Sequence, residues 1–293
     1  MASRAASRVC FLIGLLFCTS ASADVRRLTD GSILISGQIA QQDFAFFSSH
    51  SKEFEFKSPW VILNSRGGDV DAAIKIGRII RSADGTTWIK GRCYSSCALI
   101  FIAGVNRENL GELGLHRPYF ASAPLGREQI ERQMPIMRSA VKGYVEEMGI
   151  TGSFFERMFN TDPSEIDILR DDDTYKIVPR TDPTYDEITI SHSAQWHGLT
   201  TSEYRKRHLL ADSCFIYDSS GLITGLMDPD CRESTLWGLS PVDYRSRRAK
   251  ADTKCSFSDG QQQLINATPK KDRYSLPFVR QRLTCRLNMM LGK

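Results

Sequence analysis

Short apolar runs alternate with amphipathic stretches through the first half of the 293-residue chain. Residues 60–63 are continuously apolar, which is typical of a strand buried on both faces. The run ends at a polar turn that contains Gly67 and Gly68, and from Asp69 the apolar positions follow a helical stripe. A carboxylate such as Asp69 favours a helix start, because it interacts with the positive end of the helix dipole. The pattern therefore predicts a strand, a glycine turn and a helix in succession.

A second unit of the same kind follows. Residues 86–90 predict a strand, residues 91–96 a turn, and residues 97–103 an apolar helix. Gly104 closes this helix, since glycine commonly follows a helix C-terminus. The turn between the strand and the helix contains two consecutive serines, Ser95 and Ser96.

The third unit begins at residues 111–116, which predict a strand that Pro118 stops. Residues 125–148 are mostly helical by period, and we expect Pro135 to kink or divide the helix because it cannot donate a backbone hydrogen bond. Strands that alternate with helices at this spacing predict an α/β fold with a mainly parallel sheet and flanking helices.

The first residues have the layout of an export signal. Residues 1–23 carry two arginines, then an apolar run, then small residues that end at Ala23. This order is typical of a cleavable secretory signal, and the apolar run is too short to span a bilayer. We therefore expect cleavage near Ala23, a periplasmic or secreted protein, and no membrane span in the mature chain.

Charge excludes one class of partner. The chain has 38 Lys and Arg against 34 Asp and Glu, a formal charge of +4. Removal of residues 1–23 takes away two arginines and no acid, which leaves 4 − 2 = +2. A nearly balanced mature chain does not indicate a nucleic-acid-binding protein. The basic runs at residues 245–250 and 270–273 are interpreted as solvated surface.

The remaining length predicts two domains. We expect a main α/β domain over residues 24–210 and a small cysteine-rich domain over residues 211–293. Residues 162–183, rich in aspartate and proline, predict an irregular connection.

An even number of cysteines in an exported chain indicates disulfides. Two of the eight cysteines lie in the signal, and six remain: Cys93, Cys97, Cys214, Cys231, Cys255 and Cys285. The first two are four residues apart across a turn, within disulfide reach at a Cα separation of roughly 6 Å. For the other four, which allow three pairings, the simplest is Cys214 with Cys231 and Cys255 with Cys285.

Three features that suit acyl transfer follow or end predicted strands, where open α/β sheets bind ligands. They are the Gly67–Gly68 pair, the Ser95–Ser96 pair and His116. A serine at a turn into a helix can attack a carbonyl while backbone amides stabilise the oxyanion. A histidine can take the serine proton as general base.

In this order the motifs resemble the ClpP/crotonase superfamily. Asn64-Ser-Arg-Gly-Gly-Asp69 resembles the Asn-Ser-x-Gly-Gly turn of ClpP peptidases. Residues 91–104 match the family's nucleophile segment without a gap, and Gly114-Leu-His-Arg-Pro118 resembles its histidine strand. The resemblance covers residues 30–180 and is strongest over residues 59–118. It implies a ClpP-like fold and an exported serine peptidase that acts on short or unfolded peptides, without a cofactor and as a homo-oligomer.

Matched position by position, the resemblance implies a role for each site residue. Ser95 corresponds to the nucleophile and His116 to the base, while the amides of Gly68 and Ser96 form the oxyanion hole and Gly67 shapes the approach. The acid falls near Asp167, which lies 51 residues after His116. Neighbouring carboxylates that compete for this role are Asp162, Asp171 and Asp172. The sequence departs from the family pattern at Arg66, where proline is usual, and at Cys93 and Cys97, where small residues are usual.

Several alternatives remain open at this point. Ser96 competes with Ser95 as nucleophile, and Lys142 could replace the histidine as base in a serine–lysine dyad. The chain is alternatively a catalytically inactive binding or scaffolding protein with the same cleft. His192 and His197 have no clear third ligand, so we expect no metal site.

Overall fold

The computed structural model describes residues 24–120, 126–217 and 223–293. The predicted export signal lies outside the described residues. Within the described ranges, no helix is both long and apolar enough to cross a membrane.

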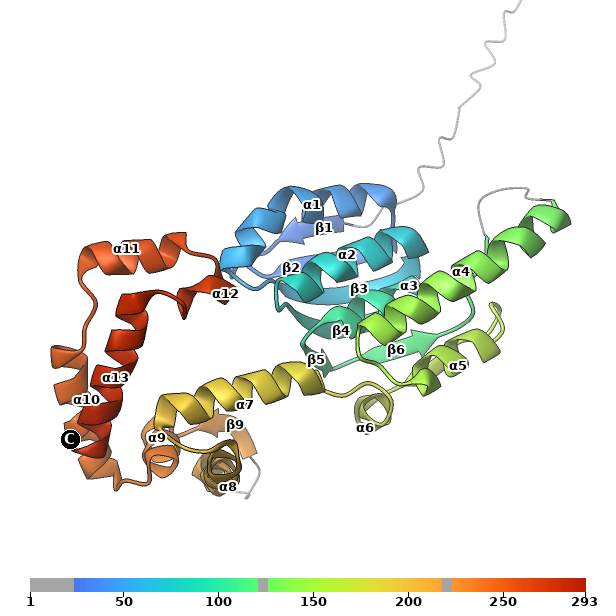
Figure 1. Cartoon of the computed structure of the whole chain (residues 1–293). Coiled ribbons are helices and arrows are strands. Elements are labelled where there is room, and N and C mark those ends of the chain that lie inside the picture. The colour runs from blue at the N-terminus through green and yellow to red at the C-terminus, as the bar shows by residue number, and fades with distance from the viewer. Residues whose placement is uncertain (1–23, 121–125, 218–222) are drawn as a thin grey trace, which may run out of the picture.

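A seven-stranded, mostly parallel sheet forms the centre of the first part of the chain, which confirms the α/β prediction (Figure 1). The strand order is β1-β2-β3-β4-β6-β7, with β5 also paired to β4. Strands β2 to β6 pair in parallel, whereas β1 and β7 lie antiparallel at the two edges. The strands are β1 (Asp24–Arg27), β2 (Ile33–Ile39), β3 (Trp60–Gly68), β4 (Thr86–Tyr94), β5 (Asn106–Asn109), β6 (Glu112–Leu115) and β7 (Asp167–Leu169).

Helices flank this sheet and bury its main core. Helix α3 packs on β3 and β4, and α2 packs on α3. All eight residues of α3 are buried, as expected for a helix that is apolar on every side. The helices are α1 (Gln41–Phe56), α2 (Val70–Ser82), α3 (Ser96–Ala103), α4 (Arg127–Glu147), α5 (Gly152–Asn160) and α6 (Asp171–Tyr175).

Several local predictions differ from the structure. The turn expected at Gly67 and Gly68 is the end of β3, which continues to Gly68 by pairing with β2. The turn expected over residues 91–96 is mostly strand, because β4 continues to Tyr94 by pairing with both β3 and β6. The connection expected over residues 162–183 contains β7 and α6. Pro135 lies inside α4 without dividing it, at a position where the preceding turn is exposed and water can satisfy the freed carbonyl.

The remainder of the chain is mainly helical. Two small hydrophobic clusters hold it together, one around Tyr204 and Leu236 and the other around Trp237 and Met290. The predicted domain boundary after residue 210 falls near the end of α8, and both α7 and α9 pack on α8. The elements are α7 (Pro183–His197), α8 (Thr201–Ala211), η1 (Asp212–Cys214), β8 (Phe215–Tyr217), β9 (Ile223–Met227), α9 (Pro229–Trp237), α10 (Pro241–Lys254), α11 (Asp259–Ala267), α12 (Lys270–Arg273) and α13 (Pro277–Leu291).

Both disulfides predicted for this region are present. Cys214 is bonded to Cys231, and Cys255 is bonded to Cys285. The second bond joins the end of α10 to α13, so that these two helices lie side by side in Figure 1. A region with such small hydrophobic clusters gains stability from covalent links that restrict its unfolded state.

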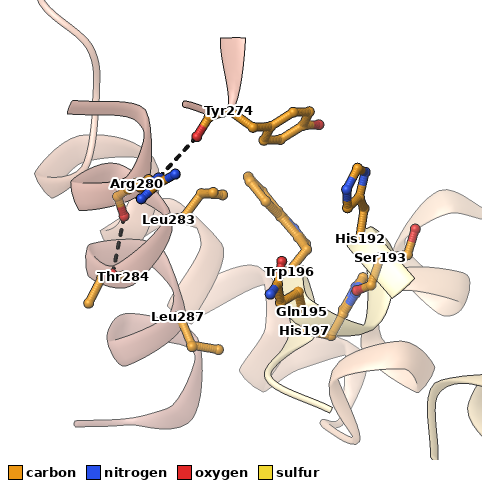
Figure 2. Close-up of a pocket in the computed structure, with 10 residues that line it drawn as sticks. All are labelled: His192, Ser193, Gln195, Trp196, His197, Tyr274, Arg280, Leu283, Thr284 and Leu287. Carbon is orange, nitrogen blue, oxygen red and sulfur yellow. Dashed lines mark hydrogen bonds between the residues drawn. The ribbon is translucent and has the colours of Figure 1, made fainter. Parts of the chain in front are cut away.

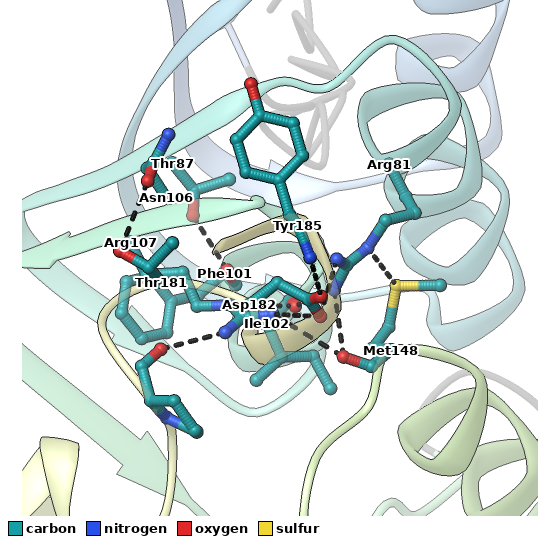
Figure 3. Close-up of polar contacts among 11 residues, drawn as sticks. Arg81, Thr87, Phe101, Ile102, Asn106, Arg107, Met148, Thr181, Asp182 and Tyr185 are labelled. Carbon is teal, nitrogen blue, oxygen red and sulfur yellow. Dashed lines mark hydrogen bonds and ion pairs between the residues drawn. The ribbon is translucent and has the colours of Figure 1, made fainter. Parts of the chain in front are cut away.

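A buried ionic network attaches α7 to the sheet-containing part (Figure 3). The Arg107 side chain is fully buried and donates to the Pro179 carbonyl at 2.8 Å. Asp182 pairs with Arg81 at 2.9 Å and caps α7 by accepting from the Tyr185 amide at 3.0 Å. Burial lowers the pKa of Arg107 to about 9, which leaves it protonated at neutral pH.

Candidate functional site

The three sequence motifs meet along one groove. Gly67, Gly68, Ser95 and His116 all line an open cavity of about 1100 Å³. They come from the carboxyl ends of β3 and β4 and from the residue after β6. Parallel strands present their carboxyl ends at one edge of the sheet, which explains why residues far apart in sequence converge there.

Ser95 occupies a sharp, strained turn between a strand and a helix. It lies directly between β4 and α3, with φ 56° and ψ −125°. Among the described non-glycine residues, only Ser95 and Asp84 have positive φ. Such a conformation costs about 1–3 kcal/mol and is characteristic of functional sites. The Ser95 amide donates to the Gly114 carbonyl at 2.9 Å, which ties the turn to β6.

A disulfide joins the strand before this turn to the helix after it. Cys93 and Cys97 are bonded, with their Cα atoms 5.1 Å apart, which confirms the predicted proximity. Both residues are completely buried. In nucleophile elbows of the Gly-x-Ser-x-Gly type, glycines occupy the positions two before and two after the serine. Here two cross-linked cysteines occupy those positions relative to Ser95.

Gly67 lies directly against the serine turn. Its φ is +95°, and a Cβ added there would lie 2.6 Å from the Tyr94 carbonyl oxygen and 2.8 Å from the Ser95 Cβ. Only glycine permits this approach of backbone to backbone. The Gly67 amide donates to the Ser65 hydroxyl at 3.0 Å, and that hydroxyl donates to the Gly37 carbonyl at 2.5 Å. The Gly67 amide is therefore already occupied within the fold.

Ser65 is a positioning residue that sequence reasoning missed. It is buried, and its hydroxyl links the Gly67 amide at the end of β3 to the Gly37 carbonyl of β2. A serine before a Gly-Gly pair at the end of a buried strand was visible in the sequence. Its role depends on β2 passing beside β3, however, and the local pattern does not show that pairing.

The two adjacent serines have different surroundings. Ser95 lines the groove, whereas Ser96 is only 2% exposed and does not. The Ser96 hydroxyl has no hydrogen-bond partner among the described residues. Its amide lies in the first turn of α3, where backbone N–H groups have no partner within the helix. Ser95 therefore lines the groove, while the Ser96 hydroxyl is buried.

His116 is held in one ring orientation. It is 8% exposed, and its Nδ1 atom lies 3.0 Å from the Arg117 carbonyl oxygen. Since a carbonyl can only accept, this contact is favourable when Nδ1 carries the proton and donates. In the neutral ring Nε2 then keeps its lone pair, which is the form that a general base requires.

The predicted acid, Asp167, lies on the strand that pairs with the one before His116, but its carboxylate is bonded to Arg157. In the β6–β7 register Asp167 is opposite Leu115, the residue before His116. Its carboxylate accepts two hydrogen bonds from Arg157, at 2.7 and 2.8 Å. These bonds raise the pKa of Arg157. Among the described contacts, none joins the Asp167 carboxylate to His116.

Among the described contacts, the other candidate carboxylates are not bonded to His116 either. Asp162 pairs with Arg117 at 3.4 Å and accepts from the Ser164 amide and hydroxyl. Asp172 is exposed on α6, and the Asp171 side chain lies outside the described part of the chain. The acceptor that contacts the His116 Nδ1 atom is thus the Arg117 backbone carbonyl.

The alternative base lies away from the groove. The Lys142 side chain is 61% exposed on α4 and lies 3.9 Å from Glu146. It is absent from the residues that line the groove, although Met137 of the same helix contributes to it. The position of Lys142 is that of a solvated helix lysine.

His192 and His197 line a different cavity, of about 610 Å³, between α7 and α13 (Figure 2). The His197 Nδ1 atom lies 2.7 Å from the Ser193 carbonyl oxygen, and its ring lies tilted against that of Trp237, with the ring centroids 4.8 Å apart. In the portion of the chain that the structure describes, no group of three or more His, Cys, Asp or Glu side chains is arranged to hold a metal ion.

The chain was compared with protein-family models and with curated proteins. No protein-family model matches the chain, and no curated protein is significantly similar to it.

Proposed function

We propose that this chain is an exported serine hydrolase, a peptidase of the ClpP/crotonase type that forms an acyl-enzyme at Ser95. The observation that carries the proposal is the conformation of Ser95. A non-glycine residue at φ 56°, between a buried strand and a buried helix, exposes its side chain to a groove that also contains His116 and Gly67. Such strain persists only where the surrounding structure enforces it.

The proposed reaction follows from the groups in the groove. The Ser95 Oγ atom attacks a substrate carbonyl carbon while His116 Nε2 takes its proton. The carbonyl oxygen becomes an oxyanion, which the amides of Gly68 and Ser96 stabilise. His116 then gives the proton to the leaving amine, and a water molecule hydrolyses the acyl-enzyme by the reverse sequence of proton transfers. The Arg117 carbonyl holds the imidazole and stabilises its protonated form.

Three disulfides support the proposal that the protein is exported, because thiols stay reduced in most cytosols. Peptides as substrates and a homo-oligomeric assembly are proposed from the resemblance to ClpP peptidases. An exported enzyme has no ATP-driven unfoldase to supply it, so short or unfolded peptides are the proposed substrates.

A fluorophosphonate probe tests the proposal, because it reacts covalently with activated serines. We expect labelling of the wild-type protein, complete loss in Ser95→Ala, and retention in Ser96→Ala. His116→Ala should slow labelling by about two to four orders of magnitude, the usual contribution of a general base. Lys142→Ala, on an exposed part of α4, should leave the rate unchanged.

Two results would contradict the proposal. Loss of labelling in Lys142→Ala but not in His116→Ala would move the base to the lysine. Absence of labelling in both oxidised and reduced protein would favour an inactive binding or scaffolding protein that keeps the cleft.

A further inference from the structure

Two arginines line the same groove as the serine. Arg66 lies near the end of β3 and Arg92 near the end of β4, and both line the groove together with Ser95. Ser65 pairs with Cys93 across these strands, so that Arg66 and Arg92 are diagonal neighbours. Both side chains lie in exposed positions. Because both lie on the same side of two neighbouring strands, their long side chains can reach a shared ligand.

Neither guanidinium has an ion-pair partner within the described ranges. Several other arginines of the sheet-containing part do pair with a carboxylate. These pairs are Arg117 with Asp162, Arg157 with Asp167, Arg170 with Glu112 and Arg180 with Glu108. Two neighbouring cations repel each other, and a shared anion would relieve the repulsion.

The acidic side chains of the groove are already engaged. Asp69 accepts from the Ala72 amide at 2.9 Å as the cap of α2, and Asp71 pairs with Lys75 at 2.6 Å. Gln41 donates to both carboxylates at 3.0 Å. Both carboxylates therefore already accept hydrogen bonds from groups of this chain.

Glu112, which is opposite Arg92 in the β4–β6 register, is also engaged. The Tyr94 hydroxyl donates to it, and Arg170 pairs with it at 2.5 Å. The hydrogen bonds from Tyr94 and Arg170 hold the pKa of Glu112 below its usual value, and Arg92 adds a smaller Coulombic effect. Arg170 and Tyr94 thus occupy the Glu112 carboxylate, and Arg92 forms no ion pair with it.

We infer that Arg66 and Arg92 form an anion subsite that selects substrates with a carboxylate beside the reacting carbonyl. The inference rests on the proposed hydrolase function and adds a substrate class to it, namely acidic peptides. A guanidinium presents a planar fork of donors that matches a carboxylate, and two forks side by side bind one carboxylate more selectively than a single charge.

The carboxylate has two possible sources in a peptide. One is an aspartate or glutamate side chain within the sequence, and the other is the free C-terminus. Both offer the same chemistry to Arg66 and Arg92, and the test separates them with three fluorescent peptides of equal length. The first contains glutamate and has an amidated C-terminus. The second replaces the glutamate by glutamine, and the third has glutamine and a free C-terminal carboxylate.

Binding is measured by fluorescence anisotropy with the full-length Ser95→Ala protein, in which no turnover interferes. We expect the glutamate peptide or the free-carboxylate peptide to bind at least about tenfold more tightly than the neutral peptide, with a preference that weakens as salt is raised. Arg66→Gln and Arg92→Gln, each in the Ser95→Ala background, should each remove most of this preference. Arg66→Lys should restore part of it, because lysine keeps the charge but not the fork.

The matched control is Arg205→Gln on α8, an exposed arginine that pairs with Glu187 far from the groove. It should leave the preference unchanged. Equal affinity for all three peptides would overturn the inference, as would an equal loss in Arg205→Gln and Arg66→Gln. This outcome is distinguishable from failure of the hydrolase proposal, because probe labelling of the wild-type protein reports on Ser95 and requires no peptide.

Discussion

The Cys93–Cys97 disulfide joins the strand before Ser95 to the helix after it, and its Cα atoms are 5.1 Å apart. Ser95 holds its positive φ inside this closed loop. The Ser95–Gly114 hydrogen bond and the close approach of Gly67 also hold this turn. A covalent link therefore constrains the conformation on which the proposed nucleophile depends.

Removing this disulfide should weaken activation of Ser95. In the loop-entropy account, so short a closed loop is worth about 2 kcal/mol, similar to the strain that it helps to hold. We expect Cys93→Ser with Cys97→Ser to slow fluorophosphonate labelling by about 10- to 30-fold. The paired control is Cys214→Ser with Cys231→Ser, which removes a disulfide outside the groove and should leave the labelling rate unchanged. Equal rates in the wild type and the first variant would show that the turn is held without the bond.

Gly67→Ala should block the site. The new Cβ would meet the Tyr94 carbonyl at 2.6 Å, and relaxation would have to move backbone at Ser95. A displacement of about 1 Å at a reacting group can cost a hundredfold, so we expect at least about a hundredfold slower labelling.

Gly143→Ala serves as the control for this substitution. Gly143 lies in α4 with nothing within 4 Å of an added Cβ, and alanine there should stabilise the protein by about 0.5–1 kcal/mol. Labelling rates and urea unfolding of both variants provide the comparison. Normal labelling in Gly67→Ala would contradict the role of this glycine.

Asp167→Asn should change labelling less than about threefold, because its carboxylate is bonded to Arg157 and not to His116. His116→Ala in the same assay shows how far the labelling rate falls when the proposed base is removed. If Asp167→Asn instead slowed labelling as much as His116→Ala, the aspartate would act as the acid of a triad after rearrangement on substrate binding.

Asp182→Asn should destabilise the protein in a pH-dependent way. Burial opposes ionisation of Asp182, but the Tyr185 amide and the Arg81 guanidinium outweigh it and lower the pKa of Asp182 below its usual 3.8. Since the folded-state pKa is depressed, the stabilisation is fully present above about pH 4 and is lost as the pH falls through the folded-state value. Asparagine keeps the capping function but not the charge.

Urea unfolding at pH 7 should show a loss of about 2–4 kcal/mol for Asp182→Asn, as expected when one partner of a largely buried pair is removed. The difference from wild type should shrink progressively as the pH is lowered below 4. Glu187→Gln, in an exposed pair with Arg205, should behave like wild type throughout. A loss for Asp182→Asn that did not vary with pH would mean that the charge is not what stabilises the start of α7.

The amino-acid sequence by itself determined the local elements of the α/β part and the three motifs of the site. Apolar runs and helical stripes follow from burial of a local face, so residues 60–63 and the stripe after Asp69 could be recognised without tertiary information. The cysteine pairs were also predictable, because each pair is close in the chain or isolated from the others. Where neighbours from elsewhere extend an element, as β3 and β6 extend β4 to Tyr94, the local pattern failed.

Only the tertiary structure decided which side chains face the groove and which are already bonded. Ser95 and Ser96 are identical in type, yet Ser95 lines the groove and the Ser96 hydroxyl is buried. Asp167 lies at the distance along the chain from His116 that the resemblance predicts for the acid, yet its carboxylate is hydrogen-bonded to Arg157. The group that contacts His116 is a backbone carbonyl. Hydrogen bonds and ion pairs require that residues far apart in the chain be positioned to within a few tenths of an ångström. Spacing along the sequence does not encode those distances, and the packing of the sheet and its helices does.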